Sequence, residues 1–313
     1  LWEAHAASHE LVRLSPAIND TRSQAAQPLS ADTAADRRAQ TAPWAANLTG
    51  PCRFRLDEPN VLVLDRAAFR INGNGDWEGP QELLRLDNVV RGRFGLPPVS
   101  GDIAQPWSEP PAKPVGSVDL RFLVDCDIAI TGARLALEQR ATSRIKLDGQ
   151  DVPSLATGFW VDESISTVAL PALSAGRHEI IITQEVRQDT TREWCYLLGE
   201  FAVALDPERR HARLSALPER LAPSDIVAQG LPFYAGDLDL EYELELPATG
   251  EYRLDLGSYN APLVNASLDG GPAIPLAFPP YVAELGQLEA GRHRLTLRVF
   301  GNRANAFGPL QLV

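Results

Sequence analysis

Two ten-residue stretches decide the fold: AGRHEIIITQ at 175–184 and AGRHRLTLRV at 290–299. Each begins with Ala-Gly-Arg-His, and each then places aliphatic residues two positions apart, at Ile180 and Ile182 in one and at Leu295 and Leu297 in the other. A period of two predicts a strand with one face in a core. Because the same stretch occurs twice in one chain, it indicates an internal repeat.

A second pair of related stretches precedes the first in the same order. LDGQDVP starts at Leu147 and LDGGPAIP starts at Leu268. Asp-Gly supplies the positive φ angles that a tight hairpin turn requires. Each stretch is therefore predicted to be a hairpin tip, and each half of the chain to be one antiparallel β-sandwich built on the same plan.

The rest of the chain agrees with an all-β class. Strand-like runs recur every 8 to 12 residues with Gly, Pro and Asp between them, which is typical of a sandwich or barrel and not of a parallel α/β sheet. The clearest alternation is in the second half, at Leu238, Leu240, Tyr242, Leu244 and Leu246.

A single helix is predicted in the first half, over 80–95. Its apolar residues fall near helical spacing, and a Gly-containing stretch with prolines follows. These apolar residues are Leu83, Leu84, Val90 and Phe94.

We expect three segments. Residues 1–50 are predicted to be a linker or the remnant of a preceding β-domain, with an exposed helix over 31–40 as the alternative. Residues 51–206 are predicted to form the first β-sandwich module and 207–313 the second. The chain has no methionine, so we expect it to be part of a longer polypeptide or a processed product.

Composition excludes several classes of partner. The net charge is -12, which argues against nucleic acid and anionic membrane as partners because both attract basic surfaces. No apolar run is long enough to span a bilayer. The three cysteines, Cys52, Cys126 and Cys195, are far apart, so we expect buried reduced thiols and no disulfide framework.

Several ordered stretches resemble the accessory modules of large bacterial glycoside hydrolases. The LDG hairpin followed by AGRH and an alternating strand is similar to their galactose-binding-like jelly rolls. Further stretches resemble the C-terminal modules of the α-L-rhamnosidase-like and β-galactosidase-like superfamily: NVLVLDRAAFRING, RLDNVVRGRFGLPP, FWVDESISTVALPAL, EWCYLLGEFAV, GLPFYAGDLDLEYELEL and GNRANAFGPL. The likeness covers roughly 60–313.

The resemblance implies two tandem galactose-binding-like β-sandwich domains and a non-catalytic role. Such enzymes usually carry their catalytic carboxylates on a (β/α)8 barrel, and no βαβ rhythm occurs here. The chain then lacks the catalytic domain. Its expected partners are that domain of the parent enzyme and an oligo- or polysaccharide, in the bacterial cytoplasm or a secreted or periplasmic compartment. No cofactor is expected.

Carboxylates are the first alternative for chemistry, because glycosidic cleavage needs two facing carboxyl groups. Asp162, Glu163, Glu193 and Glu200 lie in apolar or aromatic contexts. Turn and strand-end positions explain them better than a catalytic role does, so no catalytic residue is assigned.

Metal binding has little support in the sequence. The histidines form no compact metal set, and His178 and His293 occupy equivalent places in the repeat, which favours a common structural role. GNGDWEG at 73–79 lacks the spacing of a twelve-residue calcium loop, so it is predicted to be a hairpin turn.

Sugar binding needs aromatic platforms with polar neighbours. Aromatics within strands, such as Trp194 and Tyr196, are typical of core packing, whereas aromatics in loops suit a ligand. FPPY at 278–281 is one such loop stretch. The predicted carbohydrate-binding residues are Trp160, Tyr234, Tyr259, Asn260, Asn302 and Asn305.

Three functions remain open from the sequence: an accessory region packed against a catalytic domain, a free-standing carbohydrate-binding protein, and a glycosidase with its site between the two sandwiches. An exposed apolar patch favours the first, an open aromatic platform the second, and a close buried carboxylate pair the third.

Overall fold

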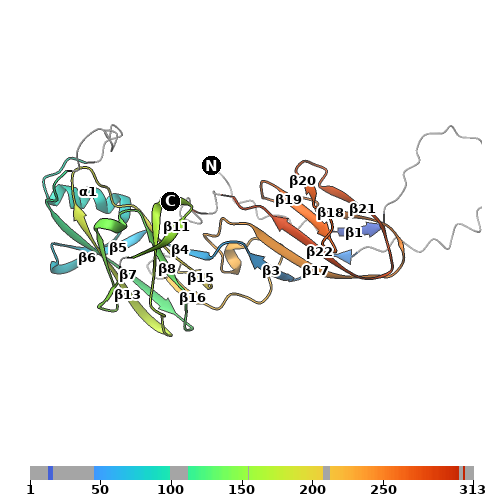
Figure 1. The fold of residues 1–313 in the computed structure, drawn as a ribbon, viewed down its shortest axis with the longest axis horizontal. Coiled ribbons are helices and arrows are strands. Elements are labelled where there is room, and N and C mark those ends of the chain that lie inside the picture. The colour runs from blue at the N-terminus through green and yellow to red at the C-terminus, as the bar shows by residue number, and fades with distance from the viewer. Residues whose placement is uncertain are drawn as a thin grey trace, which may run out of the picture. The chain divides into compact units, whose positions relative to one another are not determined.

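The computed structural model describes residues 13–16, 46–98, 112–153, 155–206, 212–302 and 306. These residues form two compact units, and Figure 1 shows that both consist almost entirely of strands. The first sandwich comprises Pro59–Pro218 and Val227–Tyr234, and the second comprises Ala235–Ala304 with Glu219–Ile226 and the part up to Glu58. Within the described ranges, no helix is long and apolar enough to cross a membrane.

The first sandwich is made of two sheets. The larger runs β10-β9-β13-β7-β16-β15, with β5 joined to β7 and β6 joined to β5. Its strands are β5 (Arg66–Ile71), β6 (Asn74–Glu82), β7 (Gly116–Cys126), β9 (Ser143–Leu147), β10 (Gln150–Val152), β13 (Gly176–Val186), β15 (Ala202–Leu205) and β16 (Ala212–Ser215).

The smaller sheet has the order β11-β12-β8-β14-β4, and all its neighbouring strands are antiparallel. Its strands are β4 (Asn60–Leu64), β8 (Arg134–Leu137), β11 (Ala156–Trp160), β12 (Asp162–Ala169) and β14 (Cys195–Gly199). A short 3-10 helix, η3 (Arg140–Thr142), follows β8, and η4 (Val227–Gln229) lies in the later part of this unit.

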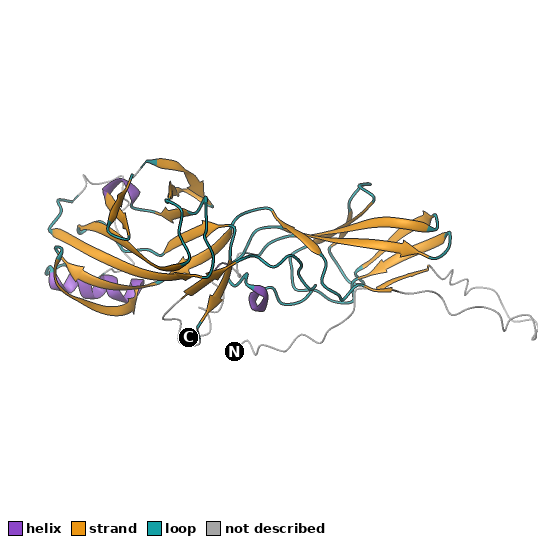
Figure 2. Ribbon diagram, turned by 90° about the horizontal axis from the view of Figure 1, so that it is seen from below, coloured by secondary structure: helices purple, strands orange, loops and turns teal. Residues whose placement is uncertain are grey.

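The second sandwich also has two sheets, with the orders β2-β1-β18-β21 and β20-β19-β22-β17-β3. Figure 2 shows its strands as orange arrows with short loops between them. The strands are β1 (Arg13–Pro16), β2 (Ala46–Asn47), β3 (Arg53–Leu56), β17 (Leu238–Leu246), β18 (Gly250–Asp255), β19 (Val264–Leu268), β20 (Ile274–Leu276), β21 (Val282–Leu288) and β22 (Gly291–Val299).

The internal repeat is visible in the strand order. The first sandwich contains the run β10-β9-β13-β7 and the second contains β20-β19-β22-β17, each with the repeated AGRH strand in the same place. The two LDG tips adopt the same turn, with φ of 49° at Asp148 and 51° at Asp269, each followed by a glycine of positive φ. The predicted all-β fold with two antiparallel sandwiches is confirmed.

Alternation along the strands builds the core of the first sandwich. Ile180 and Ile182 of β13 are fully buried, as are Leu135 of β8 and Leu197 of β14 in the facing sheet. Burying each such side chain stabilises the fold by roughly 1.5–3 kcal/mol.

The predicted helix is confirmed as α1 (Leu83–Arg93). Glu82 caps its start, because its carboxylate accepts hydrogen bonds from the backbone N–H groups of Leu84 and Arg85, both at 3.0 Å. The buried face carries Leu83, Leu86 and Val90, whereas the side chain of Leu84 is exposed, contrary to the predicted face.

The segment boundaries differ from the predicted ones. The strand β3, placed by the sequence in the first module, pairs with β17 of the second sandwich, where Arg55 is bound to Asp239. The strand β16, placed in the second module, pairs with β7 and β15 of the first. Residues 13–16 and 46–47 form strands of the second sandwich and not only a linker. Hydrogen bonding to strands far along the chain, and not position in the sequence, therefore decides which sandwich each of these strands joins.

The three cysteines are free and buried, as predicted. Burial raises the pKa of the Cys195 thiol to about 12 and that of the Cys126 thiol to about 11, with nearby carboxylates adding to both shifts. Both thiols therefore stay protonated, and a protonated thiol is a poor nucleophile.

Candidate functional site

Two aromatic clusters, one in each sandwich, are the candidate sites. In the first sandwich, Trp160 at the end of β11 packs on Tyr196 of β14, with ring centroids 4.4 Å apart and planes tilted by 49°. Both rings are partly buried and lie against the core. Both residues belong to the smaller sheet, in which β12 and β8 lie between β11 and β14.

Carboxylates surround this aromatic pair. Glu138 directly follows β8, and its pKa is raised by burial and then by the negative charges of Glu193 and Asp162. Glu193 accepts a hydrogen bond from the hydroxyl of Thr191 at 2.7 Å. Asp162 accepts one from the backbone N–H of Ser164 at 2.9 Å, which lowers its pKa. Burial and these charges therefore favour the protonated form of the Glu138 carboxyl group.

The same charges act on the phenol of Tyr196. Burial raises its pKa to about 12, and the negative charges of Glu138 and Glu193 add to the shift. The hydroxyl therefore remains protonated at neutral pH and can donate a hydrogen bond.

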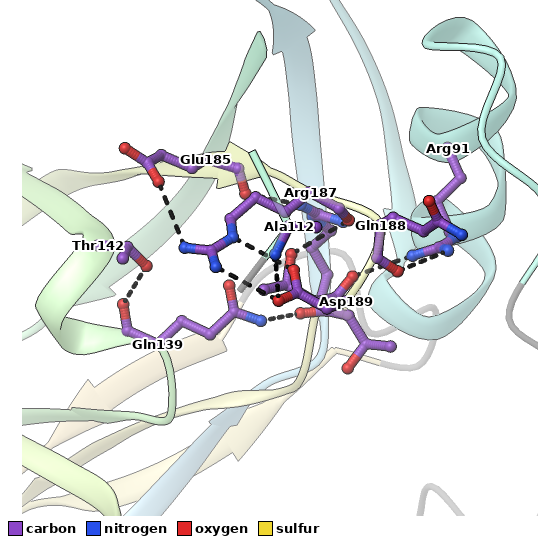
Figure 3. Close-up of polar contacts among 11 residues, drawn as sticks. Arg91, Ala112, Gln139, Thr142, Glu185, Arg187, Gln188 and Asp189 are labelled. Atoms are coloured by element: carbon purple, nitrogen blue, oxygen red, sulfur yellow. Dashed lines mark hydrogen bonds and ion pairs between the residues drawn. The ribbon is translucent and has the colours of Figure 1, made fainter. Parts of the chain in front are cut away.

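Glu193 lies in the segment after β13, residues 187–194, and other elements hold this segment in place. Figure 3 shows Arg91 of α1 reaching its backbone, and the guanidinium donates to the carbonyl oxygens of Thr190 at 3.0 Å and Gln188 at 3.1 Å. From the other side, the side-chain amide of Gln139 donates to the carbonyl oxygen of Thr191. Helix α1 and the loop after β8 thus both hold the backbone of residues 188–191.

A buried ion pair ties the same segment to α1. Arg192 is fully buried and donates to Asp87 Oδ1 at 2.7 Å and to the carbonyl oxygen of Glu185 at 2.9 Å. Trp194 Nε1 donates to the carboxylate of Glu82 at 2.9 Å. These contacts bind the polar loop that precedes β14 to α1 and to the end of β13.

The second sandwich carries a more open aromatic cluster. Tyr259 and Tyr281 pack with centroids 4.4 Å apart and planes tilted by 47°. The hydroxyl of Tyr259 donates to the carbonyl oxygen of Leu276, which orients its ring. Phe278, three residues before Tyr281, is 83% exposed, the largest exposure among the described large apolar side chains.

The predicted sugar-binding residues have different outcomes. Trp160 and Tyr259 each lie in an aromatic pair, and Asn260 is exposed beside Tyr259. Asn302 is partly buried, and Asn305 lies outside the described residues. Tyr234 requires a correction: its side chain is 1% exposed, so it is a core residue that a sugar cannot reach.

Of the carboxylates considered from sequence, Asp162 and Glu193 lie in the first aromatic cluster, whereas Glu163 and Glu200 are exposed. Within the part of the chain that the structure describes, no group of three or more His, Cys, Asp or Glu residues is placed to hold a metal ion.

Sequence reasoning missed Glu138, which closes the run ARLALE without any visible motif. It also left Phe278 and Tyr281 out of the predicted set, although FPPY stood out as an aromatic loop stretch. Two consecutive prolines between aromatics predict a turn that projects side chains outward, and this signal was available.

Comparisons with known proteins give limited similarity. No protein-family model matches the sequence, and no curated protein matches it. Among solved structures, the chain is similar to a GH2 β-galacturonidase from Eisenbergiella tayi bound to galacturonate, at 11% identity over 79% of this chain and 38% of that one, with a TM-score of 0.27.

Two rhamnosidases give comparable values. An α-L-rhamnosidase from Streptomyces avermitilis complexed with L-rhamnose shows 15% identity over 83% of this chain and 36% of that one, with a TM-score of 0.28. A rhamnosidase from Novosphingobium sp. PP1Y shows 14% identity over 69% of this chain and 22% of that one, with a TM-score of 0.25. The chain thus spans less than two fifths of the length of each.

Proposed function

We propose that this chain is a non-catalytic accessory β-sandwich region of a bacterial glycoside hydrolase that binds glycan through Tyr259, Phe278 and Tyr281. The observation that carries the glycan-binding role is the exposed ring of Phe278, three residues before Tyr281 of the Tyr259–Tyr281 pair. The ordered motifs shared with accessory jelly rolls support the accessory role, and so does the repeated sandwich plan.

The chemistry of this cluster suits a sugar. The apolar face of a pyranose ring packs on an aromatic ring, and amide groups bind its hydroxyls. Asn260 supplies an exposed amide next to Tyr259. The pinned tyrosine rings limit the entropy lost on binding. We expect weak binding with a Kd of about 1 mM, which corresponds to a net binding free energy of about -4 kcal/mol.

Affinity electrophoresis through gels containing soluble bacterial or plant polysaccharides tests the proposal. We expect retardation in at least one polysaccharide, and at least a fivefold weaker apparent affinity for Phe278→Ala and for Tyr281→Ala. Leu84→Ala removes an apolar side chain that is also exposed, on α1, and serves as the matched control. Equal mobility of all variants in every gel would contradict the proposal.

A glycosidase is the second candidate, because Glu138 combines a raised pKa with neighbouring carboxylates and an aromatic pair. A general acid needs such a shift. Our proposal predicts no hydrolysis of aryl glycosides by the chain. If hydrolysis is observed and is lost in both Glu138→Gln and Glu193→Gln, the second candidate replaces the first.

A further inference from the structure

The edge strand of the smaller sheet in the first sandwich is unusually open. Among the described strands, β11 (Ala156–Trp160) pairs only with β12, so no described strand pairs with the backbone groups of its outer edge. Ala156, Thr157, Gly158 and Phe159 are all exposed. Sheets normally protect such edges against pairing with another chain.

Charge protection is missing along this edge. The stretch LATGFWV, residues 155–161, contains no charged residue and no proline. Three of its apolar side chains face solvent, with Leu155 76% exposed, Phe159 58% and Val161 46%. Two register shifts along β11 are the protection that remains. Apolar side chains clustered on an unpaired edge mark an interaction surface.

The charges lie at one end of this edge. Val161 forms the turn between β11 and β12 with a φ of 66°, a conformation that strains a β-branched residue. The turn is followed directly by the exposed carboxylates of Asp162 and Glu163. The edge is therefore apolar along its length and acidic at its tip.

We propose that β11 is a docking site for an extended segment of a partner protein, which adds to the sheet as an antiparallel strand. The segment is apolar where it passes Leu155 and Phe159, and it begins with lysine or arginine residues that meet Asp162 and Glu163. Charge complementarity selects this occupant, because backbone pairing alone supplies affinity without orientation. A second copy of this chain offers no basic group on the equivalent stretch.

Two synthetic peptides test the proposal on the full chain. One is KKTVTVTV and the other is EETVTVTV, both capped at their ends. We expect the lysine peptide to slow deuterium exchange at the amides of residues 156–160 and to bind at least fivefold more tightly than the glutamate peptide. The combined change Asp162→Asn and Glu163→Gln should bring the two affinities together.

Phe159→Lys places a charge on the edge and should abolish the protection, and Leu155→Lys should weaken it at least fivefold. Both side chains are mostly exposed, so the melting temperature should not change. Leu84→Lys, at an exposed apolar position on α1, is the matched control and should bind like the parent. The proposal is overturned if neither peptide protects 156–160, if both bind equally, or if the chain dimerises through β11 instead.

Discussion

His178 Nδ1 lies 2.6 Å from Asp148 Oδ2, and His178 Nε2 lies 2.8 Å from the carbonyl oxygen of Ser174. The second carboxylate oxygen accepts the backbone N–H of Glu179 at 2.8 Å. Both ring nitrogens therefore face acceptors, which is the environment of an imidazolium. The hairpin tip of one LDG turn is thereby fastened to the repeated AGRH strand.

The second sandwich repeats this hydrogen-bonded unit of a histidine and an LDG aspartate, which we call a clasp. His293 Nδ1 lies 2.7 Å from Asp269 Oδ2, its Nε2 lies 2.9 Å from the carbonyl oxygen of Glu289, and Asp269 Oδ1 accepts the backbone N–H of Arg294 at 2.7 Å. The ten-residue repeat thus preserves a charged hydrogen-bonded unit, and not merely a strand pattern.

The clasps make stability depend on pH. Burial lowers the pKa of His178, but hydrogen bonds to Ser174 and Asp148 outweigh this effect, so the pKa is raised overall. Hydrogen bonds to Asp269 and Glu289 raise the pKa of His293. Each imidazolium stabilises the fold fully below the unfolded pKa of about 6.5, and this contribution is lost as pH rises through the folded pKa.

The aspartates act in the opposite direction. The pKa of Asp148 is lowered by hydrogen bonds that outweigh its burial, and that of Asp269 is lowered by its hydrogen bonds to Arg294 and His293. Their contribution is lost as pH falls below about 4. Urea unfolding from pH 3 to 9 should therefore show the strongest clasp contribution between about 4 and 6.5. A histidine pKa at or below 6.5 in an NMR titration would refute this.

Replacing each clasp carboxylate by an amide separates charge from turn geometry. Asn tolerates the positive φ of Asp148 and Asp269, so the hairpin should persist. We expect each change to Asn to lower the free energy of unfolding by about 1–2 kcal/mol. Asp148→Asn should lower the pKa of His178 and leave that of His293 unchanged, because the two clasps lie in different sandwiches.

The buried ion pair of Arg192 and Asp87 should be far more sensitive. Arg192→Met leaves the Asp87 carboxylate buried without its partner and should cost about 3–5 kcal/mol in the free energy of unfolding. The combined change Asp87→Leu and Arg192→Met removes both charges and should recover a large part of this loss. If the double variant is less stable than Arg192→Met, the pair is not a compensated charge.

Val161 provides a test of backbone strain. Val161→Gly relieves a positive φ, a gain of about 1 kcal/mol or more that offsets the conformational entropy of glycine. We expect the melting temperature to stay or rise. Val115→Gly, at an exposed valine of negative φ, should lower stability by about 0.5–1 kcal/mol. A similar loss at both positions would show that the turn is unstrained.

Most of the fold could be predicted from local sequence patterns. Alternation at 238–246 and the LDG turns predict strands and hairpins because side-chain period and positive φ are properties of a few adjacent residues. The prediction of the buried helix face was less accurate. Leu83, Leu86 and Val90 are buried and Leu84 is exposed, because the sheet packed against the helix decides which of its faces is covered.

The pairing of strands that lie far apart in the sequence could not be predicted. β3 joins β17 across more than 180 positions, and no local signal selects one sheet edge over another. The candidate site has the same limit. Tyr259 and Asn260 were found because loop aromatics are conspicuous, whereas Tyr234 looks the same in sequence and is buried. The pKa of Glu138 is raised by burial and then by the charges of Glu193 and Asp162, and only the fold brings these about.

The most direct measurement is a two-dimensional amide NMR titration of the chain with oligosaccharides released from polysaccharides. The account predicts that at least one oligosaccharide shifts the signals of residues 258–260 and 277–281 saturably, and that Phe278→Ala removes this response. If every oligosaccharide leaves these loops unchanged at about 10 mM, or if the chain cleaves the sugar, the account of a non-catalytic glycan-binding sandwich is contradicted.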